Sequence, residues 1–480
     1  MMTMKSHIFI TIFVLFSLNF FKVYGQTLEW SNTQKLRGQS VFTTIIGEDE
    51  SGIYLMRHRN KFISKFMVLE RYRQNLGFEN SKSFILKNSR ILYADMNESG
   101  IVIVKIMRDR SEGSDYISMT VLNTSFEIVQ PETKICKLNK QNSLYSFDPI
   151  IKASPDHKHY LILFQSSPNS FKYAIIDTKN SIIDANEFSL GTNGPIGKIN
   201  EALFDNALKF TLLIESPENK DGKLTYSVFE NNYLKAIEDS NHSLVKPMLF
   251  TNYYSNQSGL TGFYTSNIEN GYEGNFMATW QNLAVDSFDL KKIPFSPFIL
   301  KELEGETKAA LGFLSSNFEP VKLISRSDGG FVMISEKRSI RKEQETVMVN
   351  GLPSSQGKKI YIFEDLLIQN FTGSGLLAWE NTVSKNQNTV NDGGYLGSVI
   401  VGATPNYINI VYNDPIAVGG DIVLAQFLPN GQKQSKVIAQ GDEMNAFIVA
   451  KEGKQISPYK MVIPVLKDRK FALLKLSFNQ

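Results

Sequence analysis

Two histidines near the middle of the chain come closest to a metal-binding pattern. His157 and His159 are two residues apart, so on a β-strand they would lie on one face, and Asp156 could supply a third ligand. No other His or Cys stands at the spacing of a known zinc motif. We therefore expect a solvent-exposed hairpin tip at this position, with no metal and no other cofactor.

Carboxylates are the other groups that could support chemistry, because glycoside hydrolysis uses a pair of them as acid and as nucleophile or base. Asp95, Asp205 and Asp328 lie on or beside predicted β-strands, where acidic residues also serve as turn formers. The sequence contains no Gly-x-Ser-x-Gly motif to mark a nucleophile. Cys136 alternates with lysines and is expected to face inward as a small apolar residue. We assign no catalytic residue and expect a binding protein; a hydrolase with carboxylates in a central funnel is the alternative.

Short β-strands in a repeating order are the elements that would hold these side chains in place. Residues 405–432 (PNYINIVYNDPIAVGGDIVLAQFLPNGQ) contain two runs rich in β-branched and aromatic residues, separated and followed by Gly, Pro, Asn and Asp turns. Similar sets recur at a spacing of about 50 residues, which is typical of propeller blades. The second strand of each set begins near Ile53, Ile101, Tyr160, Phe210, Leu260, Phe331, Tyr407 and Met461.

This order predicts an all-β fold: a single β-propeller of seven or eight four-stranded blades. The last set lacks a fourth strand, and we expect Thr27–Trp30 to supply it by pairing with Phe471–Phe478. Pro464 falls within a predicted strand, where it cannot donate a ladder hydrogen bond, so the eighth set is expected to be bulged or misassigned. A pair of β-sandwiches also gives short strands at a steady spacing and is the alternative fold.

One turn of the third set carries a resemblance to a known repeat family. Residues 154–160 (SPDHKHY) resemble the Ser-Pro-Asp-Gly-Lys hairpin of the bacterial WD40-like and TolB-type propeller repeats, with His157 in the place of the usual glycine. The resemblance covers one hairpin and implies a propeller fold. It carries over no functional residue.

Two insertions interrupt the strand pattern around the fifth and sixth sets. Pro297–Leu311 starts with proline and has apolar residues on one face of a helical period, so it predicts a short inserted helix. Residues 336–358 are mostly polar and predict a long loop, whose few apolar residues either tuck against the domain or contact a partner. In a propeller these two connections open on one face, so we expect them to form a partner-binding surface. Its binding residues are expected to include Leu303, Arg341, Met348 and Leu352.

Residues 1–25 have the pattern of a secretory signal peptide. Lys5 supplies the positive charge, and Ile8–Phe21 is an apolar segment shorter than the ~20 residues that span a bilayer. Val23 and Gly25 suit a cleavage site before Gln26; an uncleaved membrane anchor is the alternative. We therefore expect residues 26–480 to form one exported propeller domain, and not an integral membrane protein.

The cysteine content and the charge balance indicate the compartment and the class of partner. A single cysteine allows no internal disulfide, which for an exported chain favours a bacterial origin, in the periplasm, at the outer membrane or outside the cell. The 51 Lys and Arg nearly balance the 48 Asp and Glu, so no strong field of one sign is available to bind nucleic acid. We expect a non-catalytic binding or scaffolding module with a protein or glycan partner in the cell envelope. An accessory subunit of a secretion or surface-motility machine is a further alternative.

The signal-peptide prediction can be tested at the N-terminus of the mature protein. Intact-mass spectrometry of protein from an envelope fraction should give a chain that begins at Gln26, because signal peptidase requires small residues just before the cleaved bond. A Gly25→Lys variant should retain residues 1–25, whereas a Lys22→Arg control should be cleaved normally. A wild-type chain that still begins at Met1 would contradict the prediction.

Overall fold

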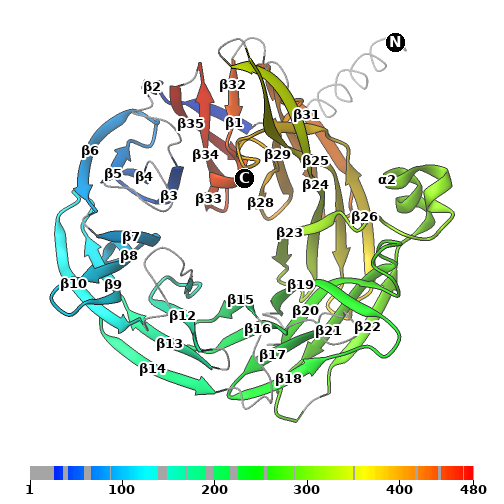
Figure 1. Ribbon diagram of the computed structural model, residues 1–480, viewed down its shortest axis with the longest axis horizontal. Coiled ribbons are helices and arrows are strands. Elements are labelled where there is room, and N and C mark those ends of the chain that lie inside the picture. The colour runs from blue at the N-terminus through cyan, green and yellow to red at the C-terminus, as the bar shows by residue number, and fades with distance from the viewer. Residues whose placement is uncertain are drawn as a thin grey trace, which may run out of the picture.

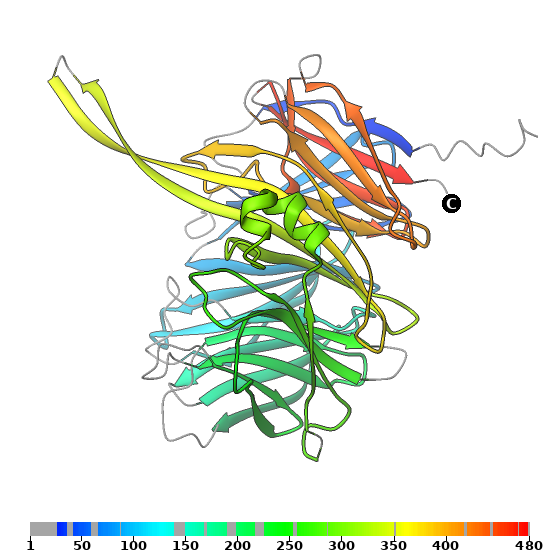
Figure 2. The ribbon, with the colours of Figure 1, turned by 90° about the vertical axis from the view of Figure 1, so that its right-hand side faces the viewer.

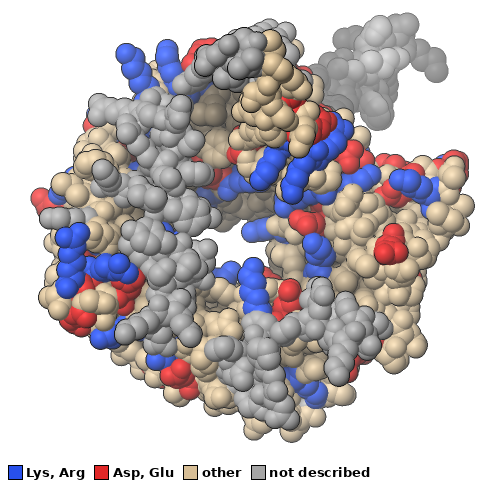
Figure 3. Space-filling model, viewed as in Figure 1, with Lys and Arg blue, Asp and Glu red and all other residues tan. Residues whose placement is uncertain are grey.

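The strands of the protein form eight antiparallel sheets that stand side by side in a ring around a central channel (Figures 1 and 3). Each sheet is a blade, with its first strand beside the channel and its last strand on the outside of the ring (Figure 1). A computed structural model describes residues 26–35, 42–58, 66–86, 88–138, 149–167, 170–189, 198–216, 225–252, 257–285, 287–349, 352–416, 420–441, 445–468 and 470–478.

The first five blades follow one another along the chain, and each contains four strands in sequence order. They are blade 1 with β3 (Phe42–Asp49), β4 (Gly52–His58), β5 (Phe66–Tyr72) and β6 (Phe78–Ile85); blade 2 with β7 (Ser89–Asn97), β8 (Gly100–Asp109), β9 (Ser114–Leu122) and β10 (Ile128–Lys137); blade 3 with β11 (Ile150–Ala153), β12 (His159–Ser167), β13 (Ser170–Asp177) and β14 (Ile182–Ser189); blade 4 with β15 (Lys198–Phe204), β16 (Phe210–Ser216), β17 (Thr225–Glu230) and β18 (Tyr233–Ile237); and blade 5 with β19 (Ser243–Asn252), β20 (Gln257–Thr265), β21 (Gly274–Trp280) and β22 (Asp289–Pro294).

The last three blades depart from this plan in two places, because blade 6 has a fifth strand and blade 8 has six. They are blade 6 with β23 (Phe318–Ser325), β24 (Phe331–Val349), β25 (Leu352–Phe371), β26 (Leu377–Val383) and β27 (Gln387–Val390); blade 7 with β28 (Ile400–Ala403), β29 (Ile408–Asp414), β30 (Asp421–Phe427) and β31 (Lys433–Ala439); and blade 8 with β32 (Ala446–Ile448), β33 (Lys454–Ser457), β34 (Lys460–Lys467), β35 (Lys470–Phe478), β1 (Gln26–Trp30) and β2 (Gln34–Lys35).

The ring is closed by the N-terminal strand, which confirms the predicted closure. β1 pairs antiparallel with β35, in a register that runs from Gln26 opposite Phe478 to Trp30 opposite Leu474. In Figure 1 the N-terminal β1 lies against the C-terminal β35. Leu28 and Trp30 pack against the core that blade 8 shares with blade 7. The fold is therefore a single propeller of eight blades.

Each pair of neighbouring blades shares one apolar core, since alternate side chains of a strand point to opposite faces of its sheet. On β8, Ile101 and Ile103 pack against blade 1, whereas Val102 and Val104 pack against blade 3. The central strands are therefore apolar on both faces. Their sequences read as nearly continuous apolar runs, and this is why they stood out in the sequence.

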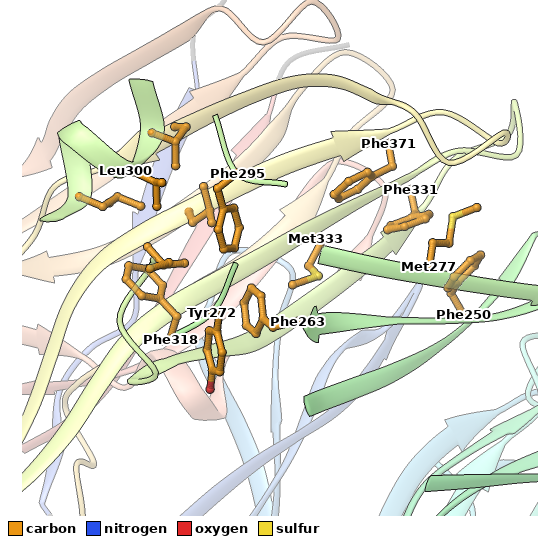
Figure 4. Close-up of a cluster of buried hydrophobic side chains, with 14 residues drawn as sticks. Phe250, Phe263, Tyr272, Met277, Phe295, Leu300, Phe318, Phe331, Met333 and Phe371 are labelled. Atoms are coloured by element: carbon orange, nitrogen blue, oxygen red, sulfur yellow. The ribbon is translucent and has the colours of Figure 1, made fainter. Parts of the chain in front are cut away.

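The predicted helix is present between blades 5 and 6 as α2 (Pro297–Ala309). Its first turn is capped by Ser296, whose hydroxyl accepts a hydrogen bond from the Ile299 N–H (3.2 Å), and Pro297 follows at the position where a missing N–H costs least. Three residues of α2 are buried in the core between blades 5 and 6. Figure 4 shows Leu300 at one end of this core with Phe295, while Phe331 and Phe371 lie at the other end.

Pro464 is accommodated inside β34 because the neighbouring inner strand is interrupted opposite it. β32 and β33 both pair with β34, and the 3₁₀ helix η1 (Ala450–Glu452) separates them. The Pro464 carbonyl accepts a hydrogen bond from the Val449 N–H (2.8 Å), and in an antiparallel strand the N–H of a residue points to the same side as its carbonyl. The side of Pro464 that lacks an N–H therefore faces the gap between β32 and β33, where no strand needs that hydrogen bond. The eighth set is bulged at its inner edge, and its assignment as a blade is correct.

The prediction of a long loop at residues 336–358 was wrong. β24 and β25 run through this segment as one hairpin, paired from Phe331 opposite Phe371 to Val349 opposite Leu352. No side chain that the structure describes in the outer part of the hairpin belongs to an apolar core, so selection for alternating apolar residues is weak there. Figure 2 shows the hairpin projecting well beyond the ring.

Removal of the closing strand tests the architecture. A chain that lacks residues 26–30 should unfold at a lower temperature than the chain that begins at Gln26, because β35 loses its outer partner and Leu28 and Trp30 leave the core. The exposed edge of β35 should also cause concentration-dependent association. Differential scanning calorimetry and light scattering measure the two effects, with Leu376→Ala, at a residue that is 66 % exposed, as the control. An unchanged melting temperature would show that the ring does not depend on this closure.

Candidate binding site

The outer part of the β24–β25 hairpin is a ribbon of only two strands. β23 pairs with β24 as far as Lys337, and β27 pairs with β25 as far as Ile360. We call the residues beyond these neighbours, 342–359, the arm (Figure 2). At ~3.4 Å per residue, the arm extends about 24 Å from its base to Val349. Lys359 at the base of the arm still exchanges hydrogen bonds with Asn391. Beyond it neither edge of the arm is paired within the described part of the chain, and open edges of this kind can accept a strand from another chain.

The four residues predicted to bind a partner lie in different environments. Met348 is exposed near the tip of the arm (69 %), so it does not tuck against the domain, and Leu352 is the first residue of β25 on the returning strand. Arg341 lies at the base of the arm with 62 % of its side chain exposed, 2.8 Å from a carboxylate oxygen of Glu343. Leu303 is buried in the core between blades 5 and 6, so its side chain is unavailable to a partner, which corrects that expectation.

The helix and the arm do not form one surface. Figures 1 and 2 show α2 against the outer edge of blade 6, beside β26, while the arm leads away from it, over the blade 7 side of the ring and out beyond one face. Only the base of the hairpin lies beside α2, as propeller topology suggests, and the arm does not. Of the predicted residues, Met348 and Leu352 belong to the arm and Arg341 lies at its base, and these three remain candidates for binding.

Positive charges face each other across the lower part of the arm. Lys342 lies directly opposite Lys359, and Lys358 follows on the next rung, opposite Glu343. Like charges directly opposite each other destabilise a β-ribbon. Lys342 and Lys359 are both exposed. Figure 3 shows Lys and Arg side chains gathered over this hairpin beside the mouth of the channel.

A buried network of charges fixes the base of the arm. The side chains of Glu336 on β24 and Lys385, just before β27, are fully buried, with 2.7 Å between Lys385 Nζ and Glu336 Oε1. The other carboxylate oxygen lies 2.5 Å from Arg338 Nε and accepts a hydrogen bond from Ser398 Oγ (2.7 Å). Gln387 accepts a hydrogen bond from Lys385 Nζ (3.0 Å) and donates one to a backbone carbonyl of β29 in blade 7 (2.6 Å). The network thus joins the arm to blade 7.

The ionisation of this pair is set by burial and by the neighbouring charges. Burial opposes the charged form of Glu336, but the cations of Lys385 and Arg338 outweigh it and hold the pKa of Glu336 below its usual value. Burial lowers the pKa of Lys385, against the attraction of Glu336. Replacing a buried ion pair by apolar residues often costs little stability, whereas removing one partner costs several kcal/mol. We interpret the network as a device that fixes the direction of the arm.

Phe363 on β25 links the base of the arm to blade 8. Lys451 Nζ lies 4.6 Å from the centre of the Phe363 ring, and the Arg338 guanidinium carbon lies 5.6 Å from it. Lys451 belongs to η1 and also donates a hydrogen bond to the Gly394 carbonyl (2.7 Å). Blades 6 and 8 are therefore in contact across the inner end of blade 7.

Glu452, the next residue of η1, connects blade 8 to two other parts of the ring. Its Oε2 accepts hydrogen bonds from the Thr43 N–H on β3 of blade 1 (3.0 Å) and from the Tyr395 hydroxyl (3.0 Å). Burial raises the pKa of Glu452 to about 7. This carboxyl group therefore titrates near neutral pH in the folded protein.

The structure brings together two residues that the sequence marked separately. His157 lies in the turn between β11 and β12 with φ of 56°, a conformation that glycine adopts easily, so it does not share a strand face with His159. Its Nδ1 lies 2.5 Å from Asp95 Oδ2 on β7, and this hydrogen bond raises the pKa of His157. Lys454 Nζ lies 3.4 Å from Asp95 Oδ1 and donates to the Ile46 carbonyl (2.6 Å). Asp95 thus links blades 2, 3 and 8 as a buried carboxylate between two basic groups.

The other candidate carboxylates do not meet Asp95. Asp205 accepts a hydrogen bond from the backbone N–H four residues later (2.9 Å), and Asp328 from the N–H two residues later (3.1 Å), so both close turns. These three carboxylates do not form the pair that a glycosidase uses. Burial raises the pKa of the Cys136 thiol to about 12, so the group is protonated at neutral pH. Within the described ranges, no three His, Cys, Asp or Glu are grouped to hold a metal ion.

None of the helices in the described residues is long and apolar enough to span a bilayer.

Comparison with solved structures returns other proteins at low sequence identity. The β-propeller domain of the Trilobed protease from Pyrococcus furiosus has a TM-score of 0.39 at 8% identity, with 83% of this chain and 98% of that chain covered. The Nup133 β-propeller domain of Vanderwaltozyma polyspora has a TM-score of 0.37 at 11% identity, with 82% and 100% covered. Sucrose-6-phosphate hydrolase from Lactobacillus gasseri has a TM-score of 0.31 at 12% identity, with 96% and 94% covered. No protein-family model and no curated protein matches the sequence.

These likenesses are too distant to indicate an activity. The class of fold follows from the chain's own eight sheets and their closure through β1, which define an eight-bladed β-propeller. The resemblance of residues 154–160 to WD40-like and TolB-type repeats remains limited to that hairpin, whose turn places His157 where the repeats have glycine.

The carboxyl group of Glu452 predicts a pH dependence of stability. Because its pKa rises from 4.5 in the unfolded chain to about 7 in the fold, the folded protein binds this proton more tightly, and its stability falls as the pH rises through that interval. Glu452→Gln should remove a loss of about 3 kcal/mol between pH 5 and pH 8. Urea unfolding at the two pH values measures it, with Glu269→Gln at an exposed position as the control. Parallel pH profiles of the wild type and Glu452→Gln would contradict the prediction.

Proposed function

We propose that the protein is an exported, non-catalytic binding module of a bacterial cell envelope, which holds a protein partner with its arm. The arm is the observation that carries this proposal. A two-stranded ribbon free in water is marginally stable, and this one presents open edges and an exposed Met348. Contact with a partner would bury the apolar tip and pair the edges. The rigid base, held by the network around Glu336, would present the arm in one direction.

The charges of the arm indicate the chemistry of the partner. Lys342, Lys358 and Lys359 lie on two adjacent rungs, and only Glu343 opposes them there. Their mutual repulsion would be relieved by carboxylates on a facing surface. The favoured partner therefore presents an acidic surface toward the base of the arm and an apolar pocket toward its tip.

The spacing of these features favours a protein over a lipid surface. Met348 lies six positions beyond Lys342, or about 20 Å along the strand. An apolar loop that inserts into a membrane reaches about 5–10 Å deep, and electrostatic attraction fades over about 8 Å at physiological salt. The lysines would lie too far from the headgroups, and Glu343 and Glu345 would lie between. A folded protein can present matching groups at both distances.

The proposed location rests on the leader sequence and agrees with the ring closure. Cleavage before Gln26 would leave β1 intact, and β1 is needed to complete blade 8. Export without disulfides is consistent with a fold that is stabilised by eight apolar cores between blades. An exported protein can bind only a partner in the same compartment, so we place the partner in the cell envelope as well.

Site-specific photocrosslinking tests the proposal. A photoreactive amino acid at position 348 should give a discrete crosslinked protein in envelope preparations, and the same group at position 376 should not. The crosslinked protein, once purified, should bind residues 26–480 in isothermal titration calorimetry. Replacing residues 344–357 by an Asn-Gly turn keeps Glu343 opposite Lys358, and it should abolish this binding without lowering the melting temperature by more than a few degrees.

Reversing the charges at the base of the arm distinguishes the contribution of the base to binding from that of the tip. Lys342→Glu with Lys359→Glu should weaken binding of the purified partner at least about tenfold, and added salt should weaken wild-type binding. Lys308→Glu, on the exposed face of α2, is the matched control. Equal affinity for the arm-deleted protein, or crosslinking only to anionic lipid vesicles, would refute the proposed function.

A further inference from the structure

The wall of the central channel contains a cavity that the arm does not reach. It lies between the innermost strands of blades 6, 7 and 8, namely β23, β28 and β33, and has a volume of about 630 Å³. Cavities that hold small ligands measure about 300–1,000 Å³. Figure 3 shows the channel open through the ring, so the cavity can be entered from solvent.

The charged residues that line this cavity are both basic. They are Lys322 on β23 and Lys454 on β33, and no carboxylate belongs to the lining. Lys454 is held in place, since its Nζ donates to the Ile46 carbonyl (2.6 Å) and lies 3.4 Å from Asp95 Oδ1. Asp95 lies outside the lining and offsets the charge of Lys454 in part, while Lys322 has no carboxylate partner among the described residues. The cavity therefore carries a positive charge.

Lys322 points into the channel because of a β-bulge. The register of β23 shifts between Pro320 and Lys322. In a regular strand Val321 and Leu323 would lie on one face, but here Val321 packs in the core with blade 7 and Leu323 in the core with blade 5. A bulge of this kind redirects a side chain, and Lys322 between them is exposed to the channel. No described residue forms an ion pair or hydrogen bond with its ammonium group.

The backbone around the two lysines adds hydrogen-bond donors. β23, β28 and β33 each pair with a neighbour on one side only, so their other edges face the channel. Part of this edge is closed by Gln455, which bonds both the N–H and the carbonyl of Ala403 (3.0 and 2.7 Å). The remaining edge amides can donate to a ligand. Ammonium groups together with free amide donors suit an anion.

We propose that this cavity binds a small anionic ligand through phosphate or carboxylate groups, with Lys322 as the principal contact and Lys454 as a second, fixed positive charge. The site is separate from the arm and does not depend on the proposed partner. Phosphate and carboxylate share the chemistry that the cavity recognises, and two probes distinguish between them.

Isothermal titration calorimetry of residues 26–480 with pyrophosphate, and separately with citrate, tests the site at low salt. At least one probe should bind with a stoichiometry of one, and Lys322→Gln should weaken it about tenfold or more, as expected for loss of one charge-assisted contact. Lys308→Gln, a 70 % exposed lysine on α2, should bind like the wild type. The stronger of the two probes identifies the preferred group.

Two outcomes would overturn the inference. The first is that neither probe binds at millimolar concentrations; the second is that Lys322→Gln binds a probe as tightly as the wild type. The melting temperature of Lys322→Gln should equal that of the wild type, because Lys322 makes no contact that the fold requires. Unchanged stability together with weakened binding assigns the effect to the cavity.

Discussion

The hydrogen-bonded pairing of β1 with β35 is the interaction on which the rest of the structure depends. A row of eight sheets has two ends, and each end would leave an apolar face and an open strand edge in water. Blade 8 packs its apolar face on blade 1, and the pairing of the first strand of the chain with this last sheet holds the two ends together. The closed ring then gives every blade two neighbours and every central strand an apolar environment on both faces, as β8 illustrates.

Closure also creates the two features that we connect with function. The ring turns the innermost edge of every sheet toward one channel, so backbone amides and the bulge at Lys322 face a shared space. It likewise places the base of the arm between blades 6, 7 and 8, where Glu336, Lys385 and Phe363 are held by residues from three sheets. The distal arm gains nothing from the ring and stands free in solvent. A rigid frame with a directed projection is suited to holding a partner at a fixed distance.

The sequence predicted the fold well and the candidate sites only in part. Apolar runs separated by turn formers located the strands because burial on both faces leaves a strong local pattern, and Pro297 with the apolar face that follows it located α2. The hairpin at 336–358 was missed because a ribbon without a core has no apolar alternation. One signal that could have revealed it is Asn350-Gly351 between Val349 and Leu352, since Asn-Gly favours a two-residue hairpin turn.

The remaining errors concern contacts between segments that are distant in the chain. An apolar helix face looks the same in the sequence whether it packs on its own core or binds a partner. Only the packing of α2 shows that Leu303 is buried. His157 and Asp95 were each noticed, but their pairing depends on two blades meeting. By itself, the sequence determined most of the strands, the repeating four-strand plan and the closing strand, because these follow from local burial and turn chemistry. Only the tertiary structure decided which charges meet, which are buried and which face the channel, because those outcomes depend on distances between blades that no local pattern records.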